Sequence, residues 1–349
     1  MAAVAICSNL PGLTLARQLR NSRSLVLRRP NKLFLRRAFT AKVRALSTAV
    51  VETKQPEPAV EETNVSTSRN ILACPICYEQ LSIDSDGGLT VDSISGSSLL
   101  CNTCKKTYYG SETHFELTAS SGAKEYGEAK APSTEFFRIP LISYIYERGW
   151  RQGFLFGGFP GPEKEFELIK NYLKPVLGGN IIDASCGSGL FARLFAKSGL
   201  FSLVVALDYS ENMLKECYEF IKQEDNFPKE KLTLVRADIS RLPFPSSSID
   251  AIHAGAAIHC WPSPSAAVAE ISRVLRPGGV FVGTTYILDG PFSFVPLLSP
   301  VTQNLTQISG SHMFTSEGQL KDLFRACGLV NFQCTRQRRF IMFSATKPC

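Results

Sequence analysis

The stretch from Asn180 to Leu190, with the sequence NIIDASCGSGL, constrains the fold of this chain more than any other. Ile181 and Ile182 suit a buried strand, and the small residues that follow Asp183 favour a tight turn. Apolar residues at helical spacing then predict a helix over 188–197. A strand, a glycine turn and a helix form a nucleotide-type site, because glycines admit close backbone approach and the helix N-terminus offers free N–H groups. Because this pattern can also occur by chance, the residues that follow it must show whether the chain has a nucleotide-type site.

Strands and helices alternate regularly after residue 161. The alternation predicts an α/β fold, a Rossmann-like and mostly parallel sheet covered on both faces, with a terminal antiparallel hairpin. Ligands of such sheets bind beyond the carboxyl ends of the strands. We expect strands at 181–183, 203–207, 232–235, 249–254 and 280–286, helices at 164–177, 188–197, 210–223, 265–275 and 317–326, and the hairpin at 332–335 and 340–345.

Acidic residues end three successive predicted strands: Asp183, Asp208 and Asp238. Asp208 lies about 20 residues beyond the glycine turn, the usual place for a carboxylate that accepts ribose hydroxyls. Asp238 is placed to accept the amino group of an adenine. Met213 and Ile239 are apolar residues suitably placed to sandwich a base. Together these residues predict a site for an adenosine-bearing cofactor.

Four segments, 182–189, 206–214, 236–244 and 274–280, together resemble class I S-adenosylmethionine-dependent methyltransferases over residues 161–349. The resemblance implies S-adenosyl-L-methionine as cofactor. It implies that the turn from Asp183 through Ser185, Gly187 and Gly189 holds the methionine part, that Asp208 holds the ribose and that Asp238 holds the adenine. Tyr209, Met213 and Ile239 are further candidate cofactor-binding residues. The family commonly has glycine where Ser185 stands. A dehydrogenase is the structural rival, but the turn lacks a third glycine. The whole chain is similar to a plant group of plastid methyltransferases.

Two Cys-x-x-Cys pairs, Cys74–Cys77 and Cys101–Cys104, are separated by 23 residues. Each pair can present two thiolates to one cation, and two pairs complete a tetrahedral sulfur site that suits zinc. Because all four ligands come from the protein, we expect a structural zinc in a small zinc-ribbon-like module over 71–118. Two unrelated thiol pairs, or a redox pair, is the alternative.

The net charge of +7 is concentrated at the N-terminus. Residues 1–51 carry ten Lys or Arg and no Asp or Glu, and the remaining residues carry 28 basic and 31 acidic groups. This composition predicts a transit peptide over 1–51, cleaved near residues 45–51, and a chloroplast location in the stroma or the plastoglobule. A mitochondrial location and a basic arm that binds nucleic acid are the alternatives. Residues 52–70 are expected to be a disordered linker, and residues 119–160 a helical connector.

His259 follows the fourth predicted strand at the open edge of the sheet, and it is the candidate catalytic base. A structural role for this histidine remains open, and His253 is expected in the core. Trp261 is expected to line the pocket or to cap it. Arg148 and Arg151 are candidates to reach a carboxylate of a ligand, with surface positions as the alternative. The apolar, proline-rich stretch 291–300, within an insertion over 287–313, suits a lid over an apolar acceptor, a contact with a lipid surface, or a packed loop.

Two functions are compatible with these features. The first is methyl transfer to an apolar plastid small molecule, such as a prenylquinone-like ring. The second is methylation of guanine in ribosomal RNA, because a zinc ribbon ahead of such a domain resembles the bacterial enzymes of that class. RNA binding relies on basic groups, and residues 52–160 carry nine basic and fourteen acidic groups, which favours the small molecule. A cofactor-binding protein without activity is a third possibility. No apolar run is long enough for a transmembrane segment.

Overall fold

A computed structural model describes residues 70–83, 89–127, 129–289 and 311–349. The transit peptide expected over 1–51, residues 52–69 of the linker and the proline-rich stretch 291–300 lie outside these ranges. All described residues belong to one compact unit, Val65–Cys349. Within this part of the chain, no helix is long and apolar enough to cross a membrane.

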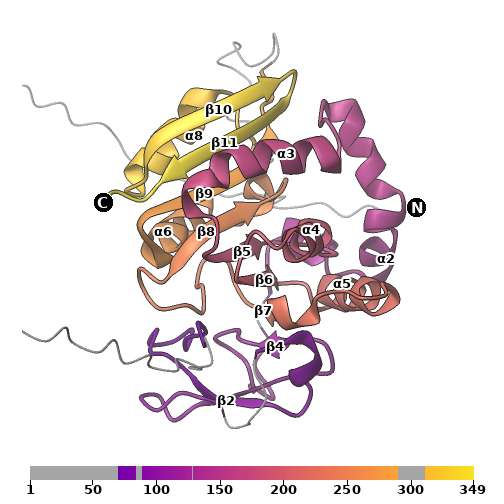
Figure 1. The fold of residues 1–349 in the computed structure, drawn as a ribbon, viewed down its shortest axis with the longest axis vertical. Coiled ribbons are helices and arrows are strands. Elements are labelled where there is room, and N and C mark those ends of the chain that lie inside the picture. Colours follow the sequence, from indigo (N-terminus) through magenta and orange to yellow (C-terminus); the bar gives the residue numbers. More distant parts are fainter. Residues whose placement is uncertain (1–69, 84–88, 128, 290–310) are drawn as a thin grey trace, which may run out of the picture. The chain divides into compact units, whose positions relative to one another are not determined.

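The main sheet has eight strands in the order β10-β11-β9-β8-β5-β6-β7-β4 (Figure 1). Neighbouring strands from β9 to β4 run parallel, and β11 pairs antiparallel with both β9 and β10. The predicted fold class and terminal hairpin are therefore confirmed. The strands are β4 (Phe115–Glu116), β5 (Asn180–Ala184), β6 (Leu203–Asp208), β7 (Leu232–Arg236), β8 (Ile249–Ala254), β9 (Leu275–Tyr286), β10 (Val330–Gln337) and β11 (Phe340–Thr346).

Helices cover both faces of this sheet, with α4 and α5 on one side and α6 on the other (Figure 1). Serine hydroxyls at Ser210, Ser263 and Ser316 accept hydrogen bonds from the first turns of α5, α6 and α8, which satisfies N–H groups that have no partner within the helix. Among the described residues from 162 onward, the helices and 3₁₀ segments are α3 (Pro162–Leu173), η3 (Lys174–Val176), α4 (Leu190–Ser198), α5 (Glu211–Gln223), η4 (Lys229–Lys231), η5 (Ile258–Cys260), α6 (Pro264–Val274) and α8 (Glu317–Ala326).

The central strands are buried on both faces, as expected for a parallel sheet between two helical layers. All six residues of β6 are buried, and so are all but the first residue of β5. These runs place Asp183 and Asp208 in or at the end of apolar strands, where a carboxylate is costly unless it has partners. The hydrogen-bond partners of these two carboxylates are therefore described with the site below.

One predicted boundary was wrong. We expected a helix over 265–275, ended by Pro277-Gly-Gly279, and a strand that begins at Val280. The structure ends α6 at Val274 and begins β9 at Leu275, which pairs with Ile249 of β8. The register between β8 and β9 shifts after Ile249, and the proline and glycines are accommodated in that irregularity.

The cysteine module forms a small antiparallel sheet of β1 (Ser82–Ile83), β2 (Ser98–Leu100) and β3 (Thr107–Tyr109), with η1 (Val91–Ser93) before β2. Tyr108 is buried and Tyr109 is exposed, as the alternation of a strand requires. The sequence did not reveal β4, which follows the module and joins the edge of the main sheet beside β7. The pairing covers an edge that would otherwise leave backbone groups without partners.

The connector between the module and the first Rossmann helix is helical, as predicted. It contains α1 (Pro132–Phe136), α2 (Pro140–Arg148) and η2 (Trp150–Gly157). Proline begins both α-helices, where a missing N–H is not needed. Arg148 forms an ion pair with Glu216 of α5, at 2.6 Å, which ties α2 to the Rossmann layer.

Candidate functional site

A cavity of about 350 Å³ lies at the carboxyl ends of the parallel strands. This position agrees with the rule for open α/β sheets, and the volume suits a small organic ligand. Seven of the predicted cofactor residues line the cavity, namely Ser185, Gly187, Asp208, Tyr209, Met213, Asp238 and Ile239. Asp183 and Gly189 do not line it, and neither does His259.

The glycine turn is fixed by contacts from outside its own strand and helix. Ser185 has a φ of 58°, a left-handed conformation that L-residues adopt at a cost. Its hydroxyl accepts a hydrogen bond of 2.9 Å from the indole Nε1 of Trp261, a buried residue that also lines the cavity. Gly187 has a φ of 56°, and its N–H donates to a carboxylate oxygen of Asp208 at 2.8 Å.

Gly189 and Asp183 support the turn rather than the cavity surface. A Cβ at Gly189 would lie 2.1 Å from the sulfur of Cys217 in α5, so this glycine allows α4 and α5 to pack closely. Nδ1 of His253 forms a hydrogen bond of 2.7 Å with a carboxylate oxygen of the buried Asp183. His253 is fully buried between Phe191 and Phe195, which agrees with its predicted place in the core.

Asp208 ends β6 with its carboxylate at the cavity wall. One oxygen accepts from the N–H of Gly187 and the other from the N–H of Ser210, each at 2.8 Å. Burial raises the pKa of this carboxyl to about 6, and the two backbone hydrogen bonds oppose that shift. Each oxygen retains acceptor capacity toward the cavity, because an ionised carboxylate offers about four lone-pair sites.

Asp238 follows β7 on the neighbouring side of the cavity. One oxygen accepts from both the N–H and the hydroxyl of Ser240, and the other lies 3.1 Å from Nζ of Lys130. Burial opposes ionisation of Asp238, but the hydrogen bonds from Ser240 and Lys130 outweigh it, so its pKa is lowered. The side chain is therefore a carboxylate, beside Ile239 on the cavity wall.

The connector contributes cavity residues that the sequence did not identify. Phe137 and Tyr146 line the cavity together with Ser133 and Thr134. The ring of Tyr146 would lie 3.2 Å from a Cβ at Gly187, so α2 packs directly on the glycine turn. Residues 135–146 are densely apolar, and this composition is the sequence signal for a buried position of the segment.

The two connector arginines take other partners. Arg148 pairs with Glu216 and stacks on Tyr144, and the guanidinium of Arg151 lies over the ring of Phe191. Neither residue lines the cavity, which favours the alternative of surface arginines over contact with a carboxylate of the ligand.

His259 lies beside the cavity wall, since Cys260 lines the cavity and is the next residue. Nδ1 of His259 is 2.9 Å from the hydroxyl of Thr285, and the imidazole packs against the ring of Tyr286. Burial lowers its pKa to about 4, so the imidazole is neutral at physiological pH. Its carbonyl accepts from the N–H of His312 at 2.7 Å, which fixes the residue beside the end of the 287–313 insertion.

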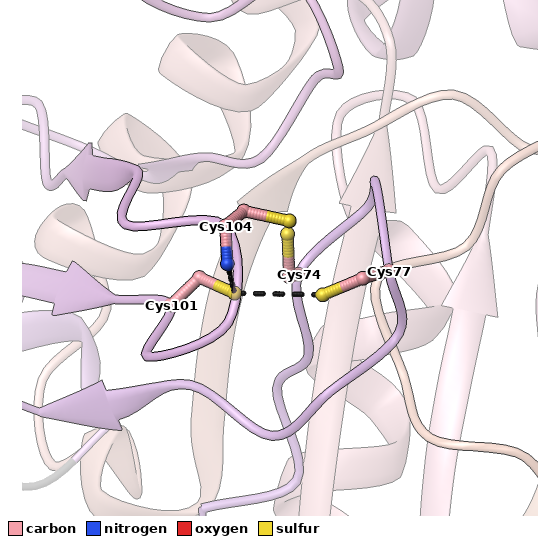
Figure 2. Close-up of side chains that lie close together, drawn as sticks. All are labelled: Cys74, Cys77, Cys101 and Cys104. Atoms are coloured by element: carbon pink, nitrogen blue, oxygen red, sulfur yellow. Dashed lines mark hydrogen bonds between the residues drawn. The ribbon is translucent and has the colours of Figure 1, made fainter.

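The four cysteines of the module converge as predicted (Figure 2). Their sulfur atoms lie within 4.8 Å of one another, and those of Cys77 and Cys101 are 3.5 Å apart. Four sulfurs at about 2.3 Å from one zinc stand roughly 3.8 Å apart, so the cluster has the size of a tetrahedral zinc site. Backbone N–H groups of Ile76 and Cys104 donate to the sulfurs of Cys74 and Cys101, as is common for thiolate ligands.

Comparison with known proteins gives a consistent result. Residues 182–283 match the family model described as a methyltransferase domain. An uncharacterized chloroplastic methyltransferase of Arabidopsis thaliana is 65% identical over 282 residues, which cover 80% of this chain and 79% of that protein. A second uncharacterized chloroplastic methyltransferase of the same plant is 48% identical over 84% of this chain and 81% of the relative. A sterol 24-C-methyltransferase of Gibberella zeae is 34% identical, over 40% of this chain and 38% of that protein.

Proposed function

Because this chain belongs to the S-adenosylmethionine-dependent methyltransferases, we propose that it transfers a methyl group to an apolar small molecule of the plastid. The observation that carries the proposal is that Asp208, Asp238 and the glycine turn line one cavity. Two carboxylates and a strained turn at the carboxyl ends of the strands match the polar parts of an adenosyl amino acid.

The residues present suit the cofactor in size and chemistry. Asp208 is the proposed acceptor for the ribose hydroxyls, with Tyr209 alongside, and Asp238 the proposed acceptor for the adenine amino group. Met213 and Ile239 are buried apolar residues on the same wall and would enclose the base. The methionine part is assigned to the turn of Ser185 and Gly187, with Asp183 and Gly189 supporting the turn from behind.

A cluster of aromatic rings lies beside the cavity, next to its lining residue Tyr146. Tyr286 packs against Phe154, Phe159 and His259, and Phe154 packs in turn against the cavity residue Tyr146. These aromatic neighbours support an apolar acceptor that extends beyond the present cavity wall. The relative whose name includes a sterol acceptor supports the same class. A prenylquinone-like or other isoprenoid ring is therefore our candidate, with the insertion over 287–313 as its proposed cover.

Bound S-adenosylmethionine supplies an activated methyl group, so the protein must mainly align the acceptor and exclude water. We keep His259 as the candidate base. Its neutral imidazole can take a proton at Nε2 while Thr285 holds Nδ1. The residue stands outside the wall of the present cavity, so this role requires an acceptor that reaches beyond Cys260.

The proposed ligands of a structural zinc are Cys74, Cys77, Cys101 and Cys104. Four protein ligands complete the tetrahedral coordination of zinc and leave no position for a reacting water. The proposed organisation remains a transit peptide over 1–51, a linker over 52–70, a zinc-ribbon-like module over 71–118, a connector over 119–160 and the catalytic domain over 161–349. The names of the two plant relatives support a chloroplast location, and we propose the stroma or the plastoglobule surface.

Incubation of the full chain with methyl-labelled S-adenosylmethionine tests the acceptor class. Parallel reactions receive a plastid lipid extract or plastid RNA. We expect label in the lipid fraction, and the Asp208→Ala variant should leave it unlabelled. Label confined to RNA would instead establish the ribosomal RNA guanine alternative, and saturable cofactor binding without any label would establish a binding protein.

A further inference from the structure

The loop that carries Asp238 connects the cavity to the cysteine module. We call residues 237–244, between β7 and β8, the Asp238 loop. Its first four residues line the cavity. Two of its remaining residues, Arg241 and Pro243, form hydrogen bonds with the segment that holds Cys74 and Cys77. The Asp238 loop therefore connects the cysteine turn directly to the proposed adenine site.

Arg241 makes the contact to the cysteine turn. Its guanidinium donates to the carbonyls of Pro75, through Nε, and of Ile76, through an Nη atom at 2.8 Å. Both carbonyls lie between Cys74 and Cys77, so two zinc ligands flank the atoms that Arg241 binds.

Two further bonds strengthen this junction. The N–H of Ala73 donates to the carbonyl of Pro243 at 2.8 Å, one residue before Cys74. At the start of the loop, the N–H of Arg241 donates to the carbonyl of Asp238 at 2.9 Å. Arg241 thus joins the cysteine turn to the backbone of the residue proposed to bind adenine.

The opposite side of the loop is held by α6, whose Arg273 also lies 3.8 Å from the ring centroid of Tyr78, the residue after Cys77. Glu270 accepts from the N–H of Leu242 at 2.9 Å, and Arg273 donates to the carbonyls of Leu242 and Phe244. The loop therefore lies between α6 and the cysteine turn, and the order of that turn depends on the cysteines.

A second junction reaches the other proposed cofactor residue. Glu116 of β4 pairs with Arg236 of β7 at 2.6 Å, and Nε of Arg236 donates to the carbonyl of Tyr209. Tyr209 lines the cavity next to Asp208. Both the start of the cysteine module and the strand that follows it are thus bonded to cavity segments.

We propose that zinc at the four cysteines is coupled to cofactor affinity, with Arg241 as the positioning residue that transmits the coupling. The strands of the module are only two or three residues long, so its cysteine turns depend on the metal for their order. Ordered turns present the carbonyls of Pro75 and Ile76 to Arg241 and hold the Asp238 loop in its binding geometry. Linkage is reciprocal, so bound cofactor must also retain zinc.

This inference rests on the proposed zinc and cofactor sites. Calorimetry distinguishes an error in either site assignment from an absence of coupling between the two sites. S-adenosylhomocysteine is titrated into the full chain before and after removal of zinc by a chelator, with metal content measured in each sample. We expect the dissociation constant to rise about tenfold on zinc removal, within the usual range for coupled sites. Purified protein that binds no zinc would overturn both the zinc assignment and the coupling.

Arg241→Met keeps the length of the side chain and removes its donors, and Arg325→Met, at an exposed arginine of α8, is the matched control. With zinc bound, the Arg241 variant should already bind the ligand about tenfold more weakly, and zinc removal should change it by less than about twofold. The control should behave as wild type.

The rate of zinc transfer to a chromophoric chelator supplies the reciprocal measurement. Saturating S-adenosylhomocysteine should slow the transfer about tenfold in wild type and not in the Arg241 variant. This measurement needs no stable zinc-free protein. Bound zinc with an unchanged dissociation constant in Arg241→Met, and no slowing in wild type, would overturn the coupling and leave both sites intact.

Discussion

The indole of Trp261 donates a 2.9 Å hydrogen bond to the hydroxyl of Ser185, across 76 residues of sequence. The bond links the turn before α4 to the segment after β8, and both residues line the cavity. Ser185 stands where the related family commonly has glycine, and it holds a left-handed φ. The hydrogen bond with Trp261 therefore offsets the cost of the strained backbone at Ser185 and holds a tryptophan of the site in place.

Replacement of Ser185 separates these two effects. Ser185→Ala keeps the strained backbone and leaves a buried indole N–H without its partner, so we expect a loss of about 1–3 kcal/mol in the free energy of unfolding. Ser185→Gly also relieves the strain and should lose less. Urea denaturation measures both values, and equal stability of wild type and the alanine variant would contradict the proposed importance of this bond.

Cofactor affinity should depend on pH through Asp208. Its pKa of about 6 lies above that of an unfolded aspartate, so the folded apoprotein favours the protonated carboxyl, and its contribution to stability is lost as pH rises through 6. Ribose hydroxyls need the ionised form as acceptor, so affinity should fall below pH 6, by at most about tenfold per pH unit. Calorimetry between about pH 5 and 8 measures the dissociation constant. The Asp208→Asn variant is the control, and its affinity should be independent of pH. An affinity of the wild type that does not change with pH would contradict the prediction.

His259 should affect turnover and not cofactor binding, because it does not line the cavity. If it is the base, His259→Gln should lower the rate of label transfer by about 10²–10⁴-fold while the dissociation constant for S-adenosylhomocysteine stays unchanged. Thr285→Val, which removes the partner of Nδ1, should lower the rate less. A His259 variant with the wild-type rate would assign this residue to the structure alone.

Loss of the cysteine site should reduce stability as well as metal content. We expect Cys74→Ser with Cys101→Ser to contain no zinc and to unfold about 5–10 °C lower, since module and sheet share one hydrophobic core. Cys327→Ser, at a half-buried cysteine outside the module, should change neither. Elemental analysis and thermal scans provide the readings; full metal retention in the double variant would refute the assignment of these ligands.

Local patterns predicted much of the fold. Apolar runs and glycine turns indicated the strands from β5 to β8 and the helices between them, because those signals lie within one element. The proposed cofactor residues that line the cavity were predicted for the same reason: they follow predicted strands of a parallel sheet. Asp208 and Asp238 are the clearest examples.

The remaining features depend on pairings between distant segments. The position of Asp183 beside His253 follows from the adjacency of β5 and β8, and a single sequence does not state strand order. The two-residue strand β4 is too short to give a pattern, and Trp261 meets Ser185 only after the sheet has formed. The connector residues Phe137 and Tyr146 were missed because an apolar helical face predicts burial without naming what it covers.

Binding of S-adenosylhomocysteine to wild type and to Asp208→Ala, measured by titration calorimetry, tests the central claim most directly. Asp322→Ala, at an exposed aspartate of α8, serves as the control for removing a carboxylate. We predict saturable binding at one site in wild type and in the control, and a loss of at least about 100-fold in affinity for Asp208→Ala, equivalent to about 2.7 kcal/mol. Equal affinity in all three proteins would contradict the assignment of this cavity as the cofactor site.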